Sequence, residues 1–296
     1  MWLKKIFNEW KAEFNIAQKE KQYDKVLAGV PDLNSLLPEI EGDEINVSHI
    51  GGAGDIIYSI PAMYELARGR KINLYLSLHQ PLKNFTKKMQ YPNGKVILNE
   101  KSLEFFRPLI LEQKDFASCE ALTDQHIHYA LDSFWKFPFD YRMGSISRWY
   151  FLTYGISRDL GKAWIETIPD NSFHDAIVLA RSSRYHAPGI SYDFLRKYSR
   201  VVFVGVRDEF NEMQKSIPNL EYKAVNNFKE LASVIAGGKF FIGNQSFPFS
   251  LAEAMKVKRV LEVYPFCPNV VVEGPDAYDF CYQQQFEKIV HTLYHQ

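Results

Sequence analysis

The feature that most constrains the fold is an alternation of short apolar runs and amphipathic segments that occurs twice along the chain. The first series covers residues 45–151 and the second covers residues 176–294. Consecutive parallel strands need a crossover connection, usually a helix, so each series predicts an open parallel sheet flanked by helices. Between them, Ile168-Pro169-Asp170-Asn171-Ser172 is typical of a linker. The sequence therefore predicts two domains, residues 1–168 and residues 169–296, which face a central cleft.

The spacing of apolar residues also places the individual elements. In the first series we expect strands at residues 45–50, 72–78, 95–98 and 128–132, and helices at residues 55–68, 82–89, 103–113 and 134–151. In the second we expect strands at residues 176–180, 201–206, 222–225, 239–243 and 259–264, and helices at residues 192–198, 209–216, 228–236, 248–255 and 280–294. Ligands of such sheets bind at the carboxyl ends of the strands, so the cleft between the domains is the expected site.

Composition and charge narrow the class of protein. Lysine plus arginine equal aspartate plus glutamate at 35 each, so no global basic field indicates a nucleic-acid partner. Hydrophobic residues make up 46% of the chain, which is enough to build two cores. The three cysteines, Cys119, Cys267 and Cys281, have neither a disulfide pattern nor a zinc spacing. Reduced thiols and a cytoplasmic location are therefore expected.

The N-terminal segment has an apolar stripe at helical spacing. Its members are Trp2, Leu3, Ile6, Phe7, Trp10 and Phe14, and Lys4, Lys5 and Lys11 lie off the stripe. No run of about 18 apolar residues is present for a membrane span, and the first residues do not have the pattern of a signal peptide. We expect a helix that packs on its own domain. The alternative is a helix lying on a membrane surface, which would place the protein peripherally at the inner face of a membrane.

A glycine-rich turn follows the first predicted strand, at His49-Ile50-Gly51-Gly52-Ala53-Gly54-Asp55. Such a turn lets the backbone approach a ligand and directs amide groups toward anions. No register completes the Gly-x-Gly-x-x-Gly dinucleotide fingerprint, and no Gly-Lys-Ser/Thr follows as in a Walker loop. By pattern alone, Asp55 is most simply an N-cap of the next helix.

A second turn joins a predicted strand to a helix at Phe241-Ile242-Gly243-Asn244-Gln245-Ser246-Phe247-Pro248. Ser246 suits an N-cap, and Pro248 lies where its missing amide hydrogen costs nothing. The exposed amides of such a helix start favour a phosphate. The same pattern is also that of an ordinary strand-to-helix turn.

Together, the two turns resemble glycosyltransferase family 9, the ADP-heptose:lipopolysaccharide heptosyltransferases. The match covers Gly54-Asp55-Ile56-Ile57-Tyr58-Ser59-Ile60-Pro61-Ala62 in the first domain. In the second domain, the residues in register are Phe241, Ile242, Gly243, Asn244, Ser246, Pro248, Leu251, Ala252 and Ala254. The chain departs from the family at three positions, where Gln245 replaces an aspartate, Phe247 a glycine and Ser250 a histidine. It therefore looks like a distant member.

The resemblance implies a GT-B fold, with two Rossmann-like domains, and inverting sugar transfer without a metal or other cofactor. In agreement with this, the chain contains no Asp-x-Asp sequence. Asp55 would be the catalytic base. The residues implied to bind the nucleotide-sugar are Gly52, Gly54, Arg181, Arg184, Gly205, Glu209, Asn244, Gln245, Ser246, Phe247 and Pro248. The expected partners are a nucleotide-sugar donor and a glycan or lipid-linked acceptor, such as a cell-surface glycan or lipopolysaccharide precursor.

Simpler roles remain open for several of these residues. Arg181 and Arg184 have the chemistry of phosphate ligands and equally of solvated loop residues. Glu209 suits a ribose contact or a helix start, and Asn244 suits a ligand contact or its own turn. Two rival functions also remain, a GT-B-shaped binding or scaffold protein that has lost catalysis and a sugar transferase that acts on DNA. Charge neutrality disfavours the DNA acceptor.

Overall fold

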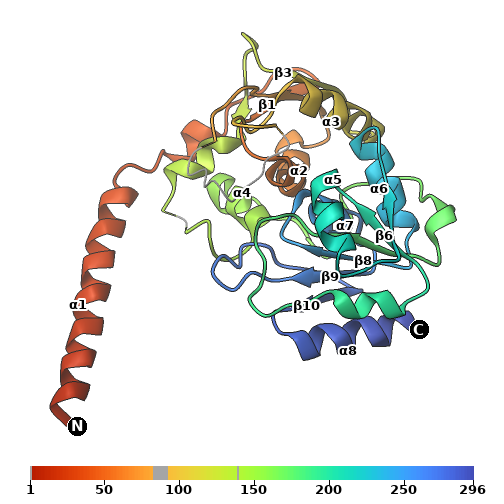
Figure 1. The fold of residues 1–296 in the computed structure, drawn as a ribbon. Helices are drawn as coiled ribbons and strands as arrows, with labels where there is room; N and C mark the ends of the chain where they lie inside the picture. The colour runs from red at the N-terminus through yellow and green to blue at the C-terminus, as the bar shows by residue number, and fades with distance from the viewer. Residues whose placement is uncertain (1, 83–92, 139) are drawn as a thin grey trace.

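The computed structural model describes residues 2–82, 93–138 and 140–296 (Figure 1). It contains two lobes, each built on a parallel β-sheet with helices packed on it. The last strand of the first sheet ends at Ala130 and the first strand of the second sheet begins at Ile177. The predicted boundary between residues 168 and 169 falls in this interval. The GT-B-like architecture expected from the sequence is confirmed.

The first lobe has a four-stranded sheet in the order β3-β2-β1-β4. Its strands are β1 (Glu44–His49), β2 (Lys71–Leu76), β3 (Phe116–Ala121) and β4 (Tyr129–Ala130). Its helical elements are α1 (Trp2–Leu27), η1 (Leu33–Leu36), α2 (Ala53–Ala67), α3 (Glu100–Glu112), η2 (Leu131–Lys136) and α4 (Ile146–Tyr154). All pairings in this sheet are parallel. The connections between consecutive strands therefore cross over the sheet, as the alternating pattern predicts.

The second lobe has a six-stranded sheet in the order β10-β9-β8-β5-β6-β7. Its strands are β5 (Ile177–Ala180), β6 (Val201–Val204), β7 (Leu220–Lys223), β8 (Phe240–Asn244), β9 (Arg259–Glu262) and β10 (Ala277–Phe280). Its helical elements are η3 (Asn171–Phe173), η4 (Asp193–Lys197), α5 (Arg207–Gln214), α6 (Phe228–Gly237), α7 (Phe247–Met255) and α8 (Gln283–Tyr294). The four strands β5, β6, β8 and β9 are buried at every residue, because helices cover both faces of the sheet.

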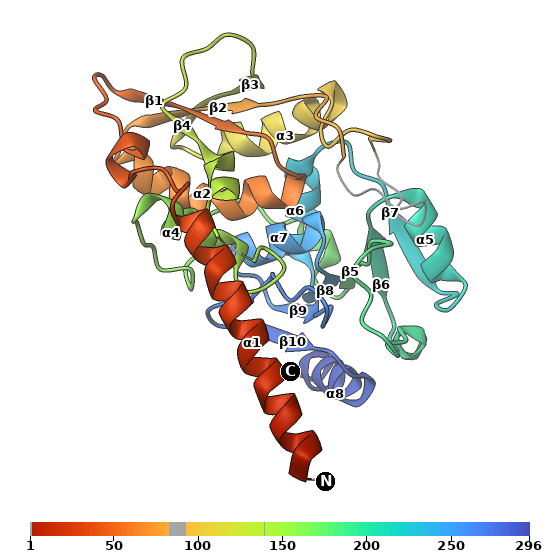
Figure 2. The same ribbon diagram turned by 90° about the vertical axis from the view of Figure 1, so that its left-hand side faces the viewer.

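The lobes are joined by packed helices rather than by a linker alone. Helix α2 packs on α7, and α3 packs on α6 (Figure 2). One hydrophobic cluster runs through this junction and includes Ile56 and Phe106 of the first lobe with Leu231 and Phe249 of the second. Shape complementarity of apolar side chains therefore sets how the two sheets face each other.

The position of α1 differs from the prediction. The helix itself is present, but it leaves the body of the first lobe and projects away from it (Figures 1 and 2). Its residues 9–27 are exposed, including Trp10 at 69% and Phe14 at 57%. The expectation that its apolar stripe packs on its own domain is wrong. Within the described residues, no helix combines the length and the hydropathy of a membrane span.

Four local predictions need correction or lie outside the described residues. The strand expected at residues 95–98 is only an isolated bridge between Pro81 and Val96. The helix expected at residues 82–89 falls almost entirely outside the described residues. The aromatic segment 134–151 forms η2 and α4 separated by a loop, and residues 192–198 form the 3₁₀ helix η4 rather than an α-helix. Strands β3 and β10 were not predicted.

Candidate active site

The glycine turn connects β1 to α2, and the helix begins two residues before the predicted start. Gly52 is the N-cap and Asp55 is the third residue of α2. The Gly52 amide donates a hydrogen bond to Asp55 Oδ2 at 3.1 Å. Asp55 therefore does contribute to capping, but as the third helix residue that accepts from the N-cap amide, which is one half of a capping box, because Gly52 has no side chain to complete it. Its carboxyl group remains at the mouth of the helix.

The conformation of the turn depends on His49, which the sequence analysis did not single out. The Gly51 amide donates to His49 Nδ1 at 2.9 Å, so Nδ1 carries no proton. Burial lowers the pKa of His49 to about 3, so the ring is neutral and its proton lies on Nε2. Nε2 therefore donates to Tyr150 Oη at 3.0 Å, and the tyrosine hydroxyl is left to donate to the carbonyl of Asp55 at 3.5 Å. This chain of bonds ties the turn to α4.

The three glycines of the turn are not equivalent. A Cβ on Gly51 would lie 2.7 Å from Cε1 of His49, so only glycine fits there. Cβ atoms on Gly52 and Gly54 would make ordinary contacts, at 3.4 Å from Asp55 Oδ2 and at 3.9 Å from α7 respectively. The α7 atoms near Gly54 belong to Phe247 and Ser250. The two motifs predicted from the sequence, one from each lobe, therefore meet at this point.

Asp55 lies in an electrostatic environment to which both lobes contribute. Burial raises the pKa of its carboxyl group, while the Gly52 amide and the positive charge of Arg184 lower it. Burial also raises the pKa of Glu209, and the Ser183 amide and Arg184 counteract that shift. Through its charge, Arg184 therefore acts on a carboxylate of each lobe. It is the second-lobe cation that acts on the predicted base.

The loop that carries Arg184 is held by two residues that the sequence assigned to the ligand. Asn244, fully buried at the end of β8, accepts from the Ser182 amide at 3.0 Å and donates to the carbonyls of Ser182 and Arg184. Glu209 accepts from the Ser183 amide at 2.9 Å. Both side chains therefore position the loop, whatever else they contact.

Arg181, at the start of the same loop, forms a buried ion pair. Its Nε and Nη2 each donate to Glu262 at 2.8 Å, and its side chain is only 12% exposed. Glu262, which is fully buried at the end of β9, also accepts from the Ala187 amide at 2.7 Å and from Tyr192 Oη at 2.9 Å. The guanidinium group also lies over the Tyr192 ring, at 4.5 Å from its centroid. Through these contacts, Arg181 anchors the start of the loop to β9 and Tyr192.

Gln245, at the first departure from the family pattern, has its side-chain amide fully engaged. It donates to the carbonyl of Cys267 at 2.7 Å and to Asn269 Oδ1 at 2.8 Å, and it accepts from the Tyr264 amide at 2.7 Å. Asn269 in turn donates to the carbonyl of Tyr141 in the first lobe at 2.9 Å. Gln245 therefore supports a connection between the lobes.

The other residues of the second motif form a helix start that is packed on one side. Ser246 is the N-cap of α7, and Pro248 is in the first turn of the helix. The ring of Phe247 packs against Phe106 of α3 and Phe228 of α6, with centroid distances of 5.6 and 4.2 Å. Phe247 thus fills part of the junction between the lobes. Gly205, farther along the sheet edge, has a φ of +146°, a conformation suited to glycine.

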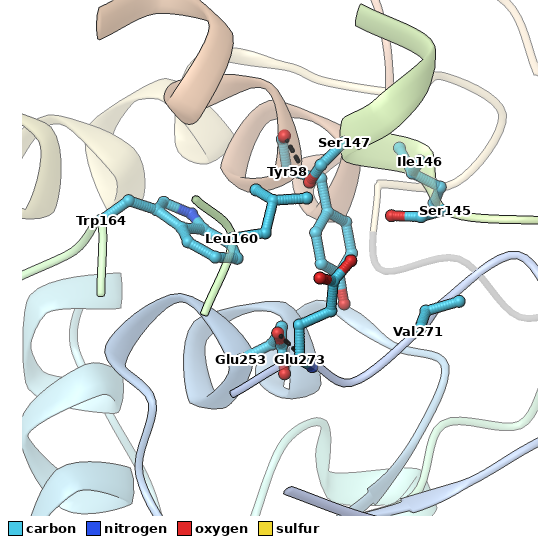
Figure 3. Close-up of a pocket in the computed structure, with 9 residues that line it drawn as sticks. All are labelled: Tyr58, Ser145, Ile146, Ser147, Leu160, Trp164, Glu253, Val271 and Glu273. Atoms are coloured by element: carbon cyan, nitrogen blue, oxygen red, sulfur yellow. Dashed lines mark hydrogen bonds between the residues drawn. The ribbon is translucent and has the colours of Figure 1, made fainter. Parts of the chain in front are cut away.

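A cluster of charged residues that the sequence analysis missed lies deeper between the lobes. Glu253 of α7 binds both Lys256 and Arg259, and all three side chains are almost entirely buried. Beside them is a cavity of about 10 Å³, lined in part by Tyr58, Ser147 and Glu253 (Figure 3). This volume suits about one water molecule rather than a ligand. The cluster is part of the joint between the lobes.

Metal-ligating side chains do not cluster in the part of the chain that the structure describes. No group of three or more His, Cys, Asp and Glu side chains lies close enough together there to hold an ion. His126 and His128 do lie side by side, with ring centroids 5.1 Å apart. The amide of Asn46 donates to Nδ1 of His128, so that nitrogen has a protein partner.

Comparison with known proteins places the fold. No protein-family model matches the sequence, and neither does any curated protein. Among solved structures, the chain is similar to E. coli heptosyltransferase WaaC with ADP, at 10% identity and a TM-score of 0.57. It is also similar to WaaC with ADP-2-deoxy-2-fluoro heptose, at 10% identity and a TM-score of 0.54. Each comparison covers 84% of this chain and 99% of the other. The chain thus has the two-lobed fold of these heptosyltransferase structures, as the resemblance of its motifs implied.

Proposed function

We propose that the protein is an inverting glycosyltransferase that needs no metal and moves a sugar from a nucleotide-sugar to a hydroxyl group of an acceptor. The observation that carries the proposal is the position of Asp55. This half-buried carboxyl group lies at the mouth of α2, where the start of α7 meets it and where Arg184 acts on it. A base, a cation and a helix start are thus brought together from both lobes.

The chemistry follows from these three groups. Asp55 accepts the proton of the acceptor hydroxyl while the oxygen attacks the anomeric carbon, and the bond from that carbon to the diphosphate oxygen breaks on the opposite side. One displacement of this kind inverts the anomeric centre. The upward shift of the Asp55 pKa makes the carboxylate a stronger base near neutral pH. Arg184 and the first-turn amides of α7 would stabilise the charge of the departing diphosphate.

The donor and the acceptor would enter from different sides of this point. The nucleotide is assigned to the carboxyl ends of the second sheet, near Gly205, Glu209 and the start of α7. The similar WaaC structures contain ADP or an ADP-heptose analogue, so a nucleoside diphosphate sugar is the donor class to test first. A glycan or lipid-linked acceptor is assigned to the first lobe, beside Asp55.

A second candidate is a scaffold that retains the fold and binds a nucleotide without turnover. The observation in its favour is that Arg181, Asn244 and Gln245 are engaged in contacts within the protein. The retained Asp55 and its supporting network with His49 favour the enzyme.

The test combines binding and turnover on one panel of nucleotide-sugars with different bases and sugars. A bound donor at 100 times its dissociation constant should add about 2.7 kcal/mol of stability, which a thermal-shift assay detects. Turnover is then measured with EDTA present, and the anomeric configuration of the product is read by NMR, with Asp55→Asn as the matched control. Binding without hydrolysis or transfer on any donor supports the scaffold. If neither binding nor turnover is found, both candidates fail.

A further inference from the structure

Exposed apolar side chains gather on one part of this molecule. Of 17 large hydrophobic side chains that are exposed among the described residues, 11 lie between Trp10 and Leu33 or between Trp135 and Leu152. Single exposed apolar residues are normal, but such a concentration marks an interaction surface. Both segments lie on the side from which α1 leaves the first lobe (Figures 1 and 2).

Helix α1 contributes a stripe that is confined to residues 2–17, the part of the helix that is distal to the lobe. At about 100° per residue, Trp10 and Phe14 fall on one face of the helix, and both are exposed. The sequence spacing places Trp2, Leu3, Ile6, Phe7 and Ala17 in the same sector, which is roughly 140° wide and whose one charged member up to Ala17 is Glu13, near the edge at Trp2. The next positions along this sector are Lys21 and Asp24, so the stripe ends there.

The first lobe adds an aromatic surface, which we define as Trp135, Tyr141, Met143 and Leu152. Their exposed fractions range from 45% to 63%, and the rings of Trp135 and Tyr141 pack edge to face with centroids 4.7 Å apart. Asp140 lies within this surface. Its pKa is lowered to about 2, mainly by hydrogen bonds from Arg142, and the charge of Lys19 on α1 contributes to the shift. The charge of Lys19, in the part of α1 nearer the lobe, therefore acts on this surface.

The chemistry of the stripe favours a lipid bilayer over a second copy of the chain. A coiled coil needs apolar residues to repeat over several heptads, and Lys21 and Asp24 interrupt that repeat. Tryptophan and phenylalanine on one face with lysines on the other are typical of a helix lying in a membrane interface. Between Trp2 and Leu27 there are six lysines and four acidic residues, so the helix carries a net charge of two positive.

We propose that the distal stripe of α1 and the adjacent aromatic surface bind the surface of an anionic lipid bilayer. The stripe inserts between head groups and acyl chains, while the lysines off the stripe remain among anionic head groups. The protein is then held with its first lobe next to the membrane. This binding is independent of sugar transfer, so it stands whether or not the proposed reaction is found.

The test is flotation of the full chain with vesicles of equimolar phosphatidylcholine and phosphatidylglycerol, and with vesicles of phosphatidylcholine alone. The protein should float with the anionic vesicles and less with the neutral ones. The double variant Trp10→Glu/Phe14→Glu should lower the bound fraction roughly tenfold or more, and Met143→Glu should lower it by a smaller factor. The matched control is Ile16→Glu, which removes a similarly exposed apolar side chain that lies outside the stripe, roughly 110° around α1 from its centre, and should lower the bound fraction much less than the double variant.

Two results would overturn the proposal. One is failure of the wild-type protein to float with anionic vesicles. The other is a dimer in light scattering that the double variant dissociates while flotation is unchanged, since that would assign the stripe to a second copy. Because these side chains are exposed, circular dichroism should show that all variants keep the wild-type fold.

Discussion

The two glycine-containing turns occupy similar places in their lobes, each between a central strand and a helix, but their polar side chains are used differently. In the first-lobe turn, the side chains of His49 and Asp55 accept hydrogen bonds from the amides of Gly51 and Gly52 and so position the backbone. The carboxyl group of Asp55 lies at the lobe junction. In the second-lobe turn, Asn244 and Gln245 both bond to neighbouring loops. Phe247 packs against the other lobe.

This difference separates the proposed base from the residues that hold the surrounding loops in place. The first turn is supported so that one side chain remains at the junction. In the second turn, the side chains of Asn244 and Gln245 hold the loop of Arg184 and the segment from Tyr264 to Asn269 by hydrogen bonds. Positions that the motif resemblance assigns to ligand binding are thus engaged in contacts within the protein, while the proposed base keeps its place at the junction. Four substitutions test this comparison, beginning with the largest expected effect.

Replacement of Asp55 by asparagine should lower turnover by about 10²–10⁴-fold, because general-base help is lost. It should not lower stability. Burial raises the Asp55 pKa, so the folded state binds this proton more tightly than the unfolded state, and stability falls as pH rises through the shifted range. Asparagine avoids that cost, so thermal unfolding at pH 7 should occur at the same or a higher temperature. A fall in both turnover and melting temperature would indicate a structural role instead.

Replacement of Arg181 by alanine should lower the free energy of unfolding by about 3–5 kcal/mol, because Glu262 would remain buried without its partner. Urea denaturation measures the loss. The matched control is Arg184→Ala on the same loop, for which we expect a smaller loss of stability and a clear loss of nucleotide affinity. The opposite ranking of the two variants would make Arg181 the phosphate contact.

Replacement of Gln245 by aspartate restores the residue type of the family but removes two hydrogen-bond donors and shortens the side chain. The carbonyl of Cys267 and Asn269 Oδ1 then lose their partner, so unfolding should become easier by about 1–3 kcal/mol. Gln245→Glu keeps the length and serves as the control for the lost donors. An aspartate variant that is as stable as the wild type and faster in transfer would assign position 245 to the donor site.

The fourth substitution concerns the pH dependence of stability. His49 is neutral when folded because burial lowers its pKa to about 3 from the ordinary 6.5. Below pH 6.5 the unfolded state takes up a proton on His49 that the folded state does not. The free energy of unfolding therefore falls by up to about 1.4 kcal/mol per pH unit as pH drops from 6.5 toward 3. His49→Asn places an amide oxygen near the position of Nδ1 and removes this titration. The midpoint of urea denaturation should therefore fall less between pH 7 and pH 5 in the variant than in the wild type. Equal falls would show that protonation of His49 does not cause the loss of stability.

The sequence predicted the central strands better than the edge strands, for a physical reason. Strands β5, β6 and β8 are covered on both faces, so each is a continuous apolar run. Strands β3 and β10 lie at the edges of their sheets and carry exposed polar residues, so no such run marks them. For helix α1, the sequence predicted the helix but not its packing. An amphipathic stripe indicates a helix with an apolar face, but it does not indicate what covers that face.

The sequence by itself determined the two-lobed α/β architecture, the two turns at strand ends and Asp55 at the start of its helix. Those features follow from local periodicity, glycine placement and capping, which act within a few residues. The tertiary structure alone decided which polar groups are engaged. Arg181 and Glu262 are 81 residues apart, and His49 and Tyr150 are 101 residues apart. A buried polar group needs a hydrogen-bond partner, and the fold determines which group lies close enough to serve as one. The spacing of two residues along the chain therefore does not predict that they will pair.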